Sequence, residues 1–312
     1  MKEEKIPSLT EKIRIFALGG LDEDGKNLFC VEVDQSIYVI EAGIKFPDNK
    51  ESLGIEFIIQ DFTYLVENKD RVAAIFITHG HDDVMGALPY LLKQVPCDVY
   101  TAPLAVKEVQ KMIRQEHISG VRVHSVKRNE KKRIGKRRIV FFPITHAYPG
   151  TFGLAIQTDQ GYIVYSGEFI EDYDDLDDAY RADFTTISEI GNEGVLALLQ
   201  ESKGAERSGH TSPNHRIAPK LLQVLETHEQ KRVFVSVYNQ SVYRIQEIID
   251  CCMASHRKMV FYSKELRELV ERLKDIGYEV DPTLVVDPQD FDNSMKGSQQ
   301  PFKLRLRKRQ RW

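Results

Sequence analysis

The segment Ile75–Gly86 contains three potential metal ligands directly after the apolar run Val72–Ile77. His79, His81 and Asp83 have the spacing His-x-His-x-Asp, and a helical pattern follows them. A strand, a polar loop and a helix in this order constrain the chain to an α/β fold with a site at the strand end. Imidazole and carboxylate groups are suitable ligands for Zn²⁺ or Mn²⁺. The segment therefore predicts a metal site.

The chemistry of such a site depends on how many ions it holds. One divalent ion lowers the pKa of a bound water to about 7, and two ions roughly 3.5–4 Å apart stabilise both oxygens of a phosphodiester displacement. A second ion would need another nitrogen ligand beside Asp83, which Val84 cannot supply. The alternative interpretation is a polar turn whose histidines cap the following helix. The complete motif favours the metal site.

Two later strand ends carry further candidate ligands. His146 ends the apolar segment 141–148, and Glu168 ends the segment 161–169. Taken singly, each residue fits a hydrogen-bonded turn as well as a ligand role. Their order after the first motif favours the ligand role.

The order of these segments resembles the metallo-β-lactamase superfamily, its β-CASP branch and, within that branch, the ribonuclease J family. The similarity runs from about residue 12 to about residue 280. It is carried by the stretches Leu18–Asn27, Glu41–Gly43, Leu53–Ile55, Asp61–Asn68, Thr78–His81, Thr145–His146, Ser166–Glu168 and Ile190–Leu196. The resemblance implies an α/β fold, namely a four-layer αβ/βα sandwich followed by the start of a β-CASP parallel α/β module.

The resemblance also implies roles for individual residues. His79, His81 and His146 would bind the first metal ion. Asp83 would bind the second ion, and Glu168 stands where the family has a bridging aspartate. Asp83 and Glu168 are therefore the expected catalytic carboxylates as well as expected ligands.

Several positions depart from the family pattern. Val84 replaces a motif histidine, while Glu41 and Glu201 stand where aspartate is usual. Glu168 is one methylene longer than aspartate, and metal ligation tolerates only a few tenths of an Å. The family also takes a ligand histidine from a later segment, and this sequence ends at Trp312, so we expect a carboxy-terminally truncated relative. We expect one weakly held Zn or Mn ion rather than two.

A second segment, Arg232–Gln246, resembles a β-CASP strand, loop and helix in which small polar residues contact substrate phosphate. Gln240 and Ser241 occupy those loop positions. Arg244 either points at phosphate or extends its charged end from the helix into solvent. These three residues are the expected RNA contacts.

Charge and composition set limits on partners. A net charge of −4 with a pI near 6.2 gives no global basic field for nucleic acid. The basic cluster within Lys127–Arg138 resembles a hairpin with Gly135 at its turn. It could contact RNA or an acidic partner, although a solvated turn is preferred. The acidic stretch Glu171–Asp183 is interpreted as a solvated loop because it lacks calcium-loop spacing.

The cysteines and the amino terminus indicate a cellular compartment. Four cysteines without CxxC spacing suggest buried free thiols in a reducing cytosol. The charged amino terminus is neither a signal nor a transit peptide, and no apolar run approaches the ~20 residues of a membrane span. We therefore expect a cytoplasmic protein without a membrane partner.

The periodicity of apolar residues predicts the following elements. The expected strands are Lys12–Ala17, Leu28–Val33, Ile37–Ile40, Val72–Ile77, Val99–Thr101, Val121–Val126, Arg138–Pro143, Leu154–Thr158, Tyr162–Tyr165, Arg232–Val237 and Met259–Tyr262. The expected helices are Phe57–Glu67, Leu104–Glu116, Ile217–Leu225, Val242–Met253 and Lys264–Ile276, with another beginning in Met85–Leu92. We expect a metallo-β-lactamase-like domain over residues 1–210, a partial β-CASP-like module over 211–290, and a basic, disordered tail over 291–312.

Two functions follow from this reading. The first is a ribonuclease J-like RNA hydrolase, acting as a 5′–3′ exonuclease, an endonuclease or both in RNA decay and maturation, including rRNA processing. The alternative is a noncatalytic partner or scaffold subunit for an intact ribonuclease J paralogue. The expected partners are RNA, such a paralogue and a second copy of the chain. A third possibility, thioester or lactone hydrolysis, is disfavoured by the β-CASP-like segments.

Overall fold

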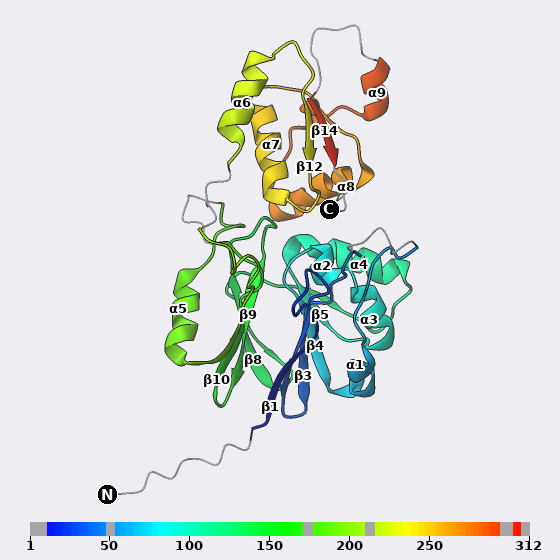
Figure 1. Ribbon diagram of the computed structural model, residues 1–312. Coiled ribbons are helices and arrows are strands. Elements are labelled where there is room, and N and C mark those ends of the chain that lie inside the picture. Colours follow the sequence, from blue (N-terminus) through cyan, green and yellow to red (C-terminus); the bar gives the residue numbers. More distant parts are fainter. Residues whose placement is uncertain (1–10, 48–53, 171–176, 210–215, 294–301, 307–312) are drawn as a thin grey trace, which may run out of the picture. The chain divides into compact units, whose positions relative to one another are not determined.

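The computed structural model describes residues 11–47, 54–170, 177–209, 216–293 and 302–306 (Figure 1). Two compact units divide the chain. The first unit consists of residues 1–144, 150–169 and 181–204. The second unit consists of residues 145–149, 170–180 and 205–312.

A six-stranded sheet in the order β1-β2-β3-β4-β5-β6 forms one half of the first unit. Its strands are β1 (Ile13–Gly19), β2 (Leu28–Val33), β3 (Ser36–Ile40), β4 (Val72–Ile77), β5 (Val99–Thr101) and β6 (Val123–Ser125). The first three strands are antiparallel, and β3 to β6 run parallel. Parallel strands place their carboxyl ends at one edge, where the loop after β4 carries the His-x-His-x-Asp motif.

A five-stranded sheet in the order β11-β10-β9-β8-β7 forms the other half. Its strands are β7 (Lys131–Ile134), β8 (Arg137–Pro143), β9 (Phe152–Thr158), β10 (Gly161–Tyr165) and β11 (Val195–Leu199). The strands are antiparallel except for the parallel pair of β10 and β11. The expected hairpin is confirmed by β7 and β8, with Gly135 at a φ of 57° in the turn.

Alternating side chains of β4 explain the layers. Phe76 faces the second sheet, where its ring centroid lies 5.8 Å from that of Phe141 in β8. Ile75 and Ile77 belong to the core cluster on the helical side. Helices α1 (Thr63–Glu67), α2 (Asp82–Met85), α3 (Leu88–Gln94) and α4 (Val106–Gln115) accompany the first sheet, and α5 (Phe184–Glu193) covers the second (Figure 1). The expected α/β sandwich is confirmed.

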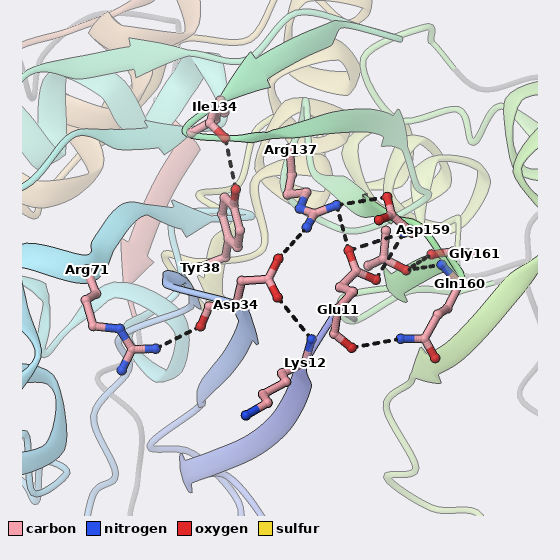
Figure 2. Close-up of polar contacts among 11 residues, drawn as sticks. Glu11, Lys12, Asp34, Tyr38, Arg71, Ile134, Arg137, Asp159, Gln160 and Gly161 are labelled. Carbon is pink, nitrogen blue, oxygen red and sulfur yellow. Dashed lines mark hydrogen bonds and ion pairs between the residues drawn. The ribbon is translucent and has the colours of Figure 1, made fainter. Parts of the chain in front are cut away.

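A polar network joins the two sheets at the ends of several strands (Figure 2). The guanidinium of Arg137 pairs with Glu11 at 2.6 Å, with Asp34 at 2.9 Å and with Asp159 at 3.3 Å. The Glu11 carboxylate also accepts hydrogen bonds from the backbone N–H of Asp159. Arg137 opens β8, whereas Asp34 lies in the turn between β2 and β3, so the network ties one sheet to the other.

One predicted helix is partly wrong. Residues 57–62 of the expected helix Phe57–Glu67 are not helical, and α1 begins only at Thr63. Asp61 accepts a hydrogen bond from the backbone N–H of Thr63, which starts the helix there. The backbone of Ile58 instead exchanges hydrogen bonds with that of Lys45.

The second unit contains a parallel sheet in the order β12-β14-β13. Its strands are β12 (Phe234–Val237), β13 (Met259–Phe261) and β14 (Phe302–Leu306), and its helices are α6 (Ala218–Thr227), α7 (Val242–Ala254), α8 (Lys264–Leu273) and α9 (Pro288–Asn293). Short 3₁₀ helices η1 (Lys69–Arg71), η2 (Pro103–Ala105), η3 (Lys274–Ile276) and η4 (Pro282–Leu284) complete the described elements.

The structure corrects the expectation of a disordered tail over 291–312. Residues 302–306 form β14, which pairs with both neighbouring strands. Their sequence alternates apolar and basic residues, a period typical of strands, although the segment as a whole is basic. Residues 294–301 and 307–312 of the expected tail lie outside the described residues.

Within the described part of the chain, every helix is too short or too polar to cross a membrane.

Candidate metal centre

Four side chains form a group with the geometry of a metal site. One ligand atom from each of His79, His81, His146 and Glu168 lies within 4.8 Å of the other three. His79 and His81 follow β4, His146 follows β8 and Glu168 follows β10, so each ligand stands at a strand end. Three imidazoles and one carboxylate are a donor set that suits Zn²⁺ and other divalent transition metals. The residues present therefore fit a single ion.

Hydrogen bonds orient the first histidine of this group. The hydroxyl of Thr78 donates to Glu41 at 2.6 Å, and the backbone N–H of Thr78 donates to the other oxygen of Glu41 at 3.1 Å. Nδ1 of His79 lies 3.0 Å from the Thr78 hydroxyl. Because the hydroxyl gives its proton to Glu41, Nδ1 carries the proton in this contact. The Nε2 lone pair is then available to an ion.

Glu41 is a buried acid in the position expected from the sequence. Its side chain is fully buried, and its backbone has a φ of 66°. Burial raises the pKa of Glu41 well above its usual range, although the hydrogen bonds from Thr78 act in the opposite direction. The Tyr165 hydroxyl donates a further hydrogen bond to Glu41. The longer glutamate thus retains an orienting contact next to the motif.

Close backbone packing explains the glycine in Glu41–Gly43. A Cβ on Gly43 would lie 1.5 Å from the carbonyl oxygen of Asp83, so only glycine fits. The same carbonyl accepts the backbone N–H of Asn27 at 3.2 Å. The loop that carries Asp83 is therefore held in place by its packing against Gly43 and by the hydrogen bond from Asn27.

Asp83 lies beside the group but contributes none of its four ligand atoms. Its side chain is hydrogen-bonded to Glu168. Glu168 also accepts a hydrogen bond from the side-chain amide of Asn27 at 3.4 Å. Burial, followed by the negative charges of Asp83 and Glu201, raises the pKa of Glu168 to about 8. A cation here would relieve this repulsion.

The side chain of Val84 lies in the core and is not a metal ligand. Its side chain is 1% exposed and packs in the core cluster of the first sheet with Ile44, Met85 and Leu88. Residue 84 therefore contributes to the core of the first unit.

Comparisons with known proteins agree with this geometry. The sequence profile described as "Beta-lactamase superfamily domain" matches residues 47–233. The chain belongs to the beta-lactamase superfamily. Curated relatives within it include "Ribonuclease J 2" of Staphylococcus epidermidis, 33% identical over 93% of this chain, and "Ribonuclease J2" of Bacillus subtilis, 35% identical over 90%. The resemblance to the ribonuclease J family is therefore confirmed.

The chain spans only part of the length of its curated relatives. The chain covers 52% of the Staphylococcus epidermidis protein and 50% of the Bacillus subtilis protein, about half their length. A crystal structure titled as a protein of unknown function from Enterococcus faecalis V583 superposes with a TM-score of 0.65 at 14% identity, covering 95% of this chain and 78% of the other. This last similarity supports the fold alone.

The expected RNA contacts lie in the second unit, in the turn after β12 and in the first turn of α7. Ser241 precedes the first helical residue, and its backbone N–H donates to the carbonyl of Tyr238. Gln240 lies in the same turn, where its carbonyl accepts the backbone N–H of residue 242. Arg244 forms an ion pair with Glu247 in α7. Their contact with phosphate stays a prediction.

Other expected features also have defined positions. All four cysteines are free, and three of them are buried. Of the acidic stretch Glu171–Asp183, residues 171–176 lie outside the described residues, and Asp183 accepts hydrogen bonds from two backbone N–H groups at the start of α5. In the basic hairpin, Lys131 pairs with Glu189 at 3.7 Å.

Sequence reasoning assigned no role to Thr78 and Asn27, which donate hydrogen bonds to acids of the site, or to Lys203, which donates one to Asp24. Thr78 and Asn27 lie in family-like stretches, so their positions could have drawn attention. Lys203 follows Glu201 by two residues, and nothing in the sequence reveals its contacts. Burial alone would lower the pKa of Lys203, but the hydrogen bond and charge of Asp24, with the charges of Glu168 and Asp83, raise it.

Proposed function

We propose that this chain is a ribonuclease J-like, metal-dependent RNA hydrolase that works with one divalent ion. The carrying observation is the group of His79, His81, His146 and Glu168, whose ligand atoms lie within 4.8 Å of one another. The similarity to proteins named ribonuclease J 2 supports RNA as the substrate class. Attack would be 5′–3′ exonucleolytic, endonucleolytic or both, in RNA decay and maturation in the cytoplasm.

The roles of the residues follow from their chemistry. Three histidines and Glu168 would hold Zn or Mn, which when bound acidifies water and stabilises charge on phosphate. Asp83, hydrogen-bonded to Glu168, would accept a proton or orient the attacking water. Gln240, Ser241 and Arg244 would contact the RNA backbone from the β-CASP-like module. With one ion instead of two, we expect slow turnover.

Metal content measured together with RNA digestion tests this proposal. The full chain is purified without chelator, analysed for Zn and Mn, and incubated with a 5′-labelled RNA. Near-stoichiometric metal and cleavage that a chelator abolishes are the expected results. His81→Asn should lose both, whereas the matched variant His117→Asn, at an exposed histidine with a φ of 53°, should retain both because asparagine tolerates that backbone. A folded sample without metal or cleavage contradicts the proposal.

A second candidate is a noncatalytic partner subunit. Two observations favour it: Val84 packs in the core, and Asp83 supplies no ligand atom to the four-residue group. In this case the chain would bind an intact ribonuclease J paralogue, or a second copy of itself, and alter the activity of the complex. Sedimentation of the chain mixed with such a paralogue, followed by RNA digestion, distinguishes this role. A stable complex containing a metal-free chain would support it over the enzyme.

A further inference from the structure

A cavity of about 420 Å³ lies within the second unit, away from the four metal-ligand candidates. It is bounded by one face of α7, the start of α6 and the segments 177–180 and 276–278. All of its lining residues belong to this one unit. Its volume lies within the roughly 300–1,000 Å³ that is typical of small-molecule sites. The cavity is therefore large enough to hold a small organic ligand.

Three tyrosines from separate segments line the cavity. The rings of Tyr180 and Tyr243 meet edge to face, with their centroids 5.0 Å apart. The hydroxyl of Tyr278 donates to the carboxylate of Asp250 at 2.7 Å and lies 3.1 Å from the backbone carbonyl of Gln246. Aromatic side chains of this kind are the surfaces on which unstacked bases of RNA pack. The lining therefore favours a planar ligand.

A hydrogen-bond donor and an acceptor lie next to each other on the α7 face of the cavity. Gln246 and Asp250 are four residues apart, so they share one face of the helix. Gln246 is only 9% exposed, and its Oε1 accepts a hydrogen bond from the Tyr180 hydroxyl. Within the described residues nothing accepts from its Nε2, and nothing donates to the second oxygen of Asp250. The cavity thus presents one amide donor beside one carboxylate acceptor.

The charge of the lining excludes some ligands. Glu247 is paired with Arg244, whereas Asp177 and Asp250 have no cationic partner within the part of the chain that the structure describes. Arg216 is the only basic residue among the described residues that line the cavity. Two uncompensated carboxylates disfavour a phosphate group inside the cavity. They favour a neutral group that donates hydrogen bonds, because charge-assisted hydrogen bonds to a carboxylate are strong.

Adenine and cytosine have the edge that matches this pair of side chains. Each base carries an exocyclic amino group beside a ring nitrogen that accepts a hydrogen bond, whereas uracil carries a carbonyl oxygen in place of the amino group. We propose that the cavity binds an adenine or cytosine base of an RNA strand. Asp250 accepts from the amino group, Gln246 donates to the ring nitrogen, and the tyrosines pack on the base. The inference rests on the proposed function only in taking RNA as the source of the base.

Equilibrium dialysis of the full chain with labelled adenosine, cytidine and uridine tests the cavity, with chelator present so that the metal centre takes no part. Adenosine and cytidine should bind, and uridine should bind at least about tenfold more weakly. Asp250→Asn keeps an oxygen for the Tyr278 hydroxyl but offers the base a donor. It should weaken adenosine binding about tenfold and remove the preference over uridine. The matched control is Glu226→Gln, at an exposed residue of α6, which should bind as the wild type does.

Competition identifies the source of the base. A short oligoadenylate that displaces labelled adenosine supports an RNA strand, and retention of adenosine would overturn that source. Absence of nucleoside binding to the folded chain, equal binding of uridine, or binding of spermidine alone would overturn the inference. These results would leave the proposed function standing, because RNA cleavage at the metal centre is measured separately. Adenosine binding by a chain that neither holds metal nor cleaves RNA would instead support the cavity and contradict the hydrolase.

Discussion

Val84 faces the core from a position directly beside an acid of the centre. An imidazole at this site would be buried among apolar side chains, where an unsatisfied polar group costs about 1–3 kcal/mol. We predict that Val84→His lowers the free energy of unfolding by about that amount in urea titrations and adds no metal ion. Val195→His, at a residue that is 43% exposed, should change the free energy by less than about 0.5 kcal/mol.

The opposite outcome for Val84→His would be informative. If the variant bound a second ion without loss of stability, the α2 segment would have to rotate its side chain out of the core. Packing of the residue 84 side chain in the core would then be only one of two conformations accessible to this segment.

Burial keeps the cysteine thiols protonated and unreactive. It raises the pKa of Cys30 and Cys97 to about 12 and that of Cys251 to about 11. At pH 8 we predict slow reaction of the native thiols with Ellman's reagent and fast reaction of four thiols after denaturation. The pKa of the buried thiols in the folded protein exceeds the unfolded value near 9. Burial of the neutral thiols therefore makes its full contribution to the free energy of unfolding below pH 9.

The pH dependence has a defined direction. As the pH rises from about 9 toward 12, the unfolded thiols ionise first, so the free energy of unfolding should fall over this window. Rapid modification of several thiols in the native protein at pH 8 would contradict the buried positions.

At the scale of elements, Arg137 connects the two sheets of the sandwich. The side chain of its partner Glu11 is only 2% exposed, so removing the guanidinium leaves a buried carboxylate without this charge partner. We predict that Arg137→Met lowers the free energy of unfolding by about 3 kcal/mol in urea titrations. Arg133→Met, at an exposed residue of the same hairpin, should change it by less than about 0.5 kcal/mol. Equal effects of the two substitutions would rule out a special role for the network.

The sequence was sufficient for elements whose apolar pattern is unambiguous. Strands β2 and β4 coincide with the predicted ranges Leu28–Val33 and Val72–Ile77, which are rich in β-branched and aromatic residues. Helix α5 and strand β11 received no prediction. The run Val195–Leu199 is continuously apolar yet partly exposed, and periodicity alone does not distinguish such a run from a helix.

The ligands of the centre were predictable because each of them follows an apolar segment that the sequence identifies as a strand. His79, His81, His146 and Glu168 come together as the resemblance implied. The contact of Lys203 with Asp24 depends on the pairing of β10 with β11 and on a loop 179 residues earlier in the sequence. Such contacts follow from tertiary structure, and no local pattern encodes them.

At the scale of the whole molecule, metal binding should appear as added stability. A ligand that binds only the folded protein stabilises it by about 2.7 kcal/mol at one hundred times its dissociation constant. We predict that Mn²⁺ at this excess raises the thermal unfolding midpoint of the full chain, measured by calorimetry. His81→Asn should abolish the shift, and an equal shift in that variant would place the ion elsewhere. More than one transition is expected, because the chain consists of two units.

The ligands and the core of the first unit are separate sets of residues. The ligands stand on loops after β4, β8 and β10, and His79 alone among the four is fully buried. The space between the sheets is filled instead by rings such as those of Phe76 and Phe141. Replacing a ligand therefore removes little of the packing on which folding depends. Over evolutionary time such a scaffold can lose its chemistry stepwise by neutral drift, while the folded chain persists for any task that needs only its shape.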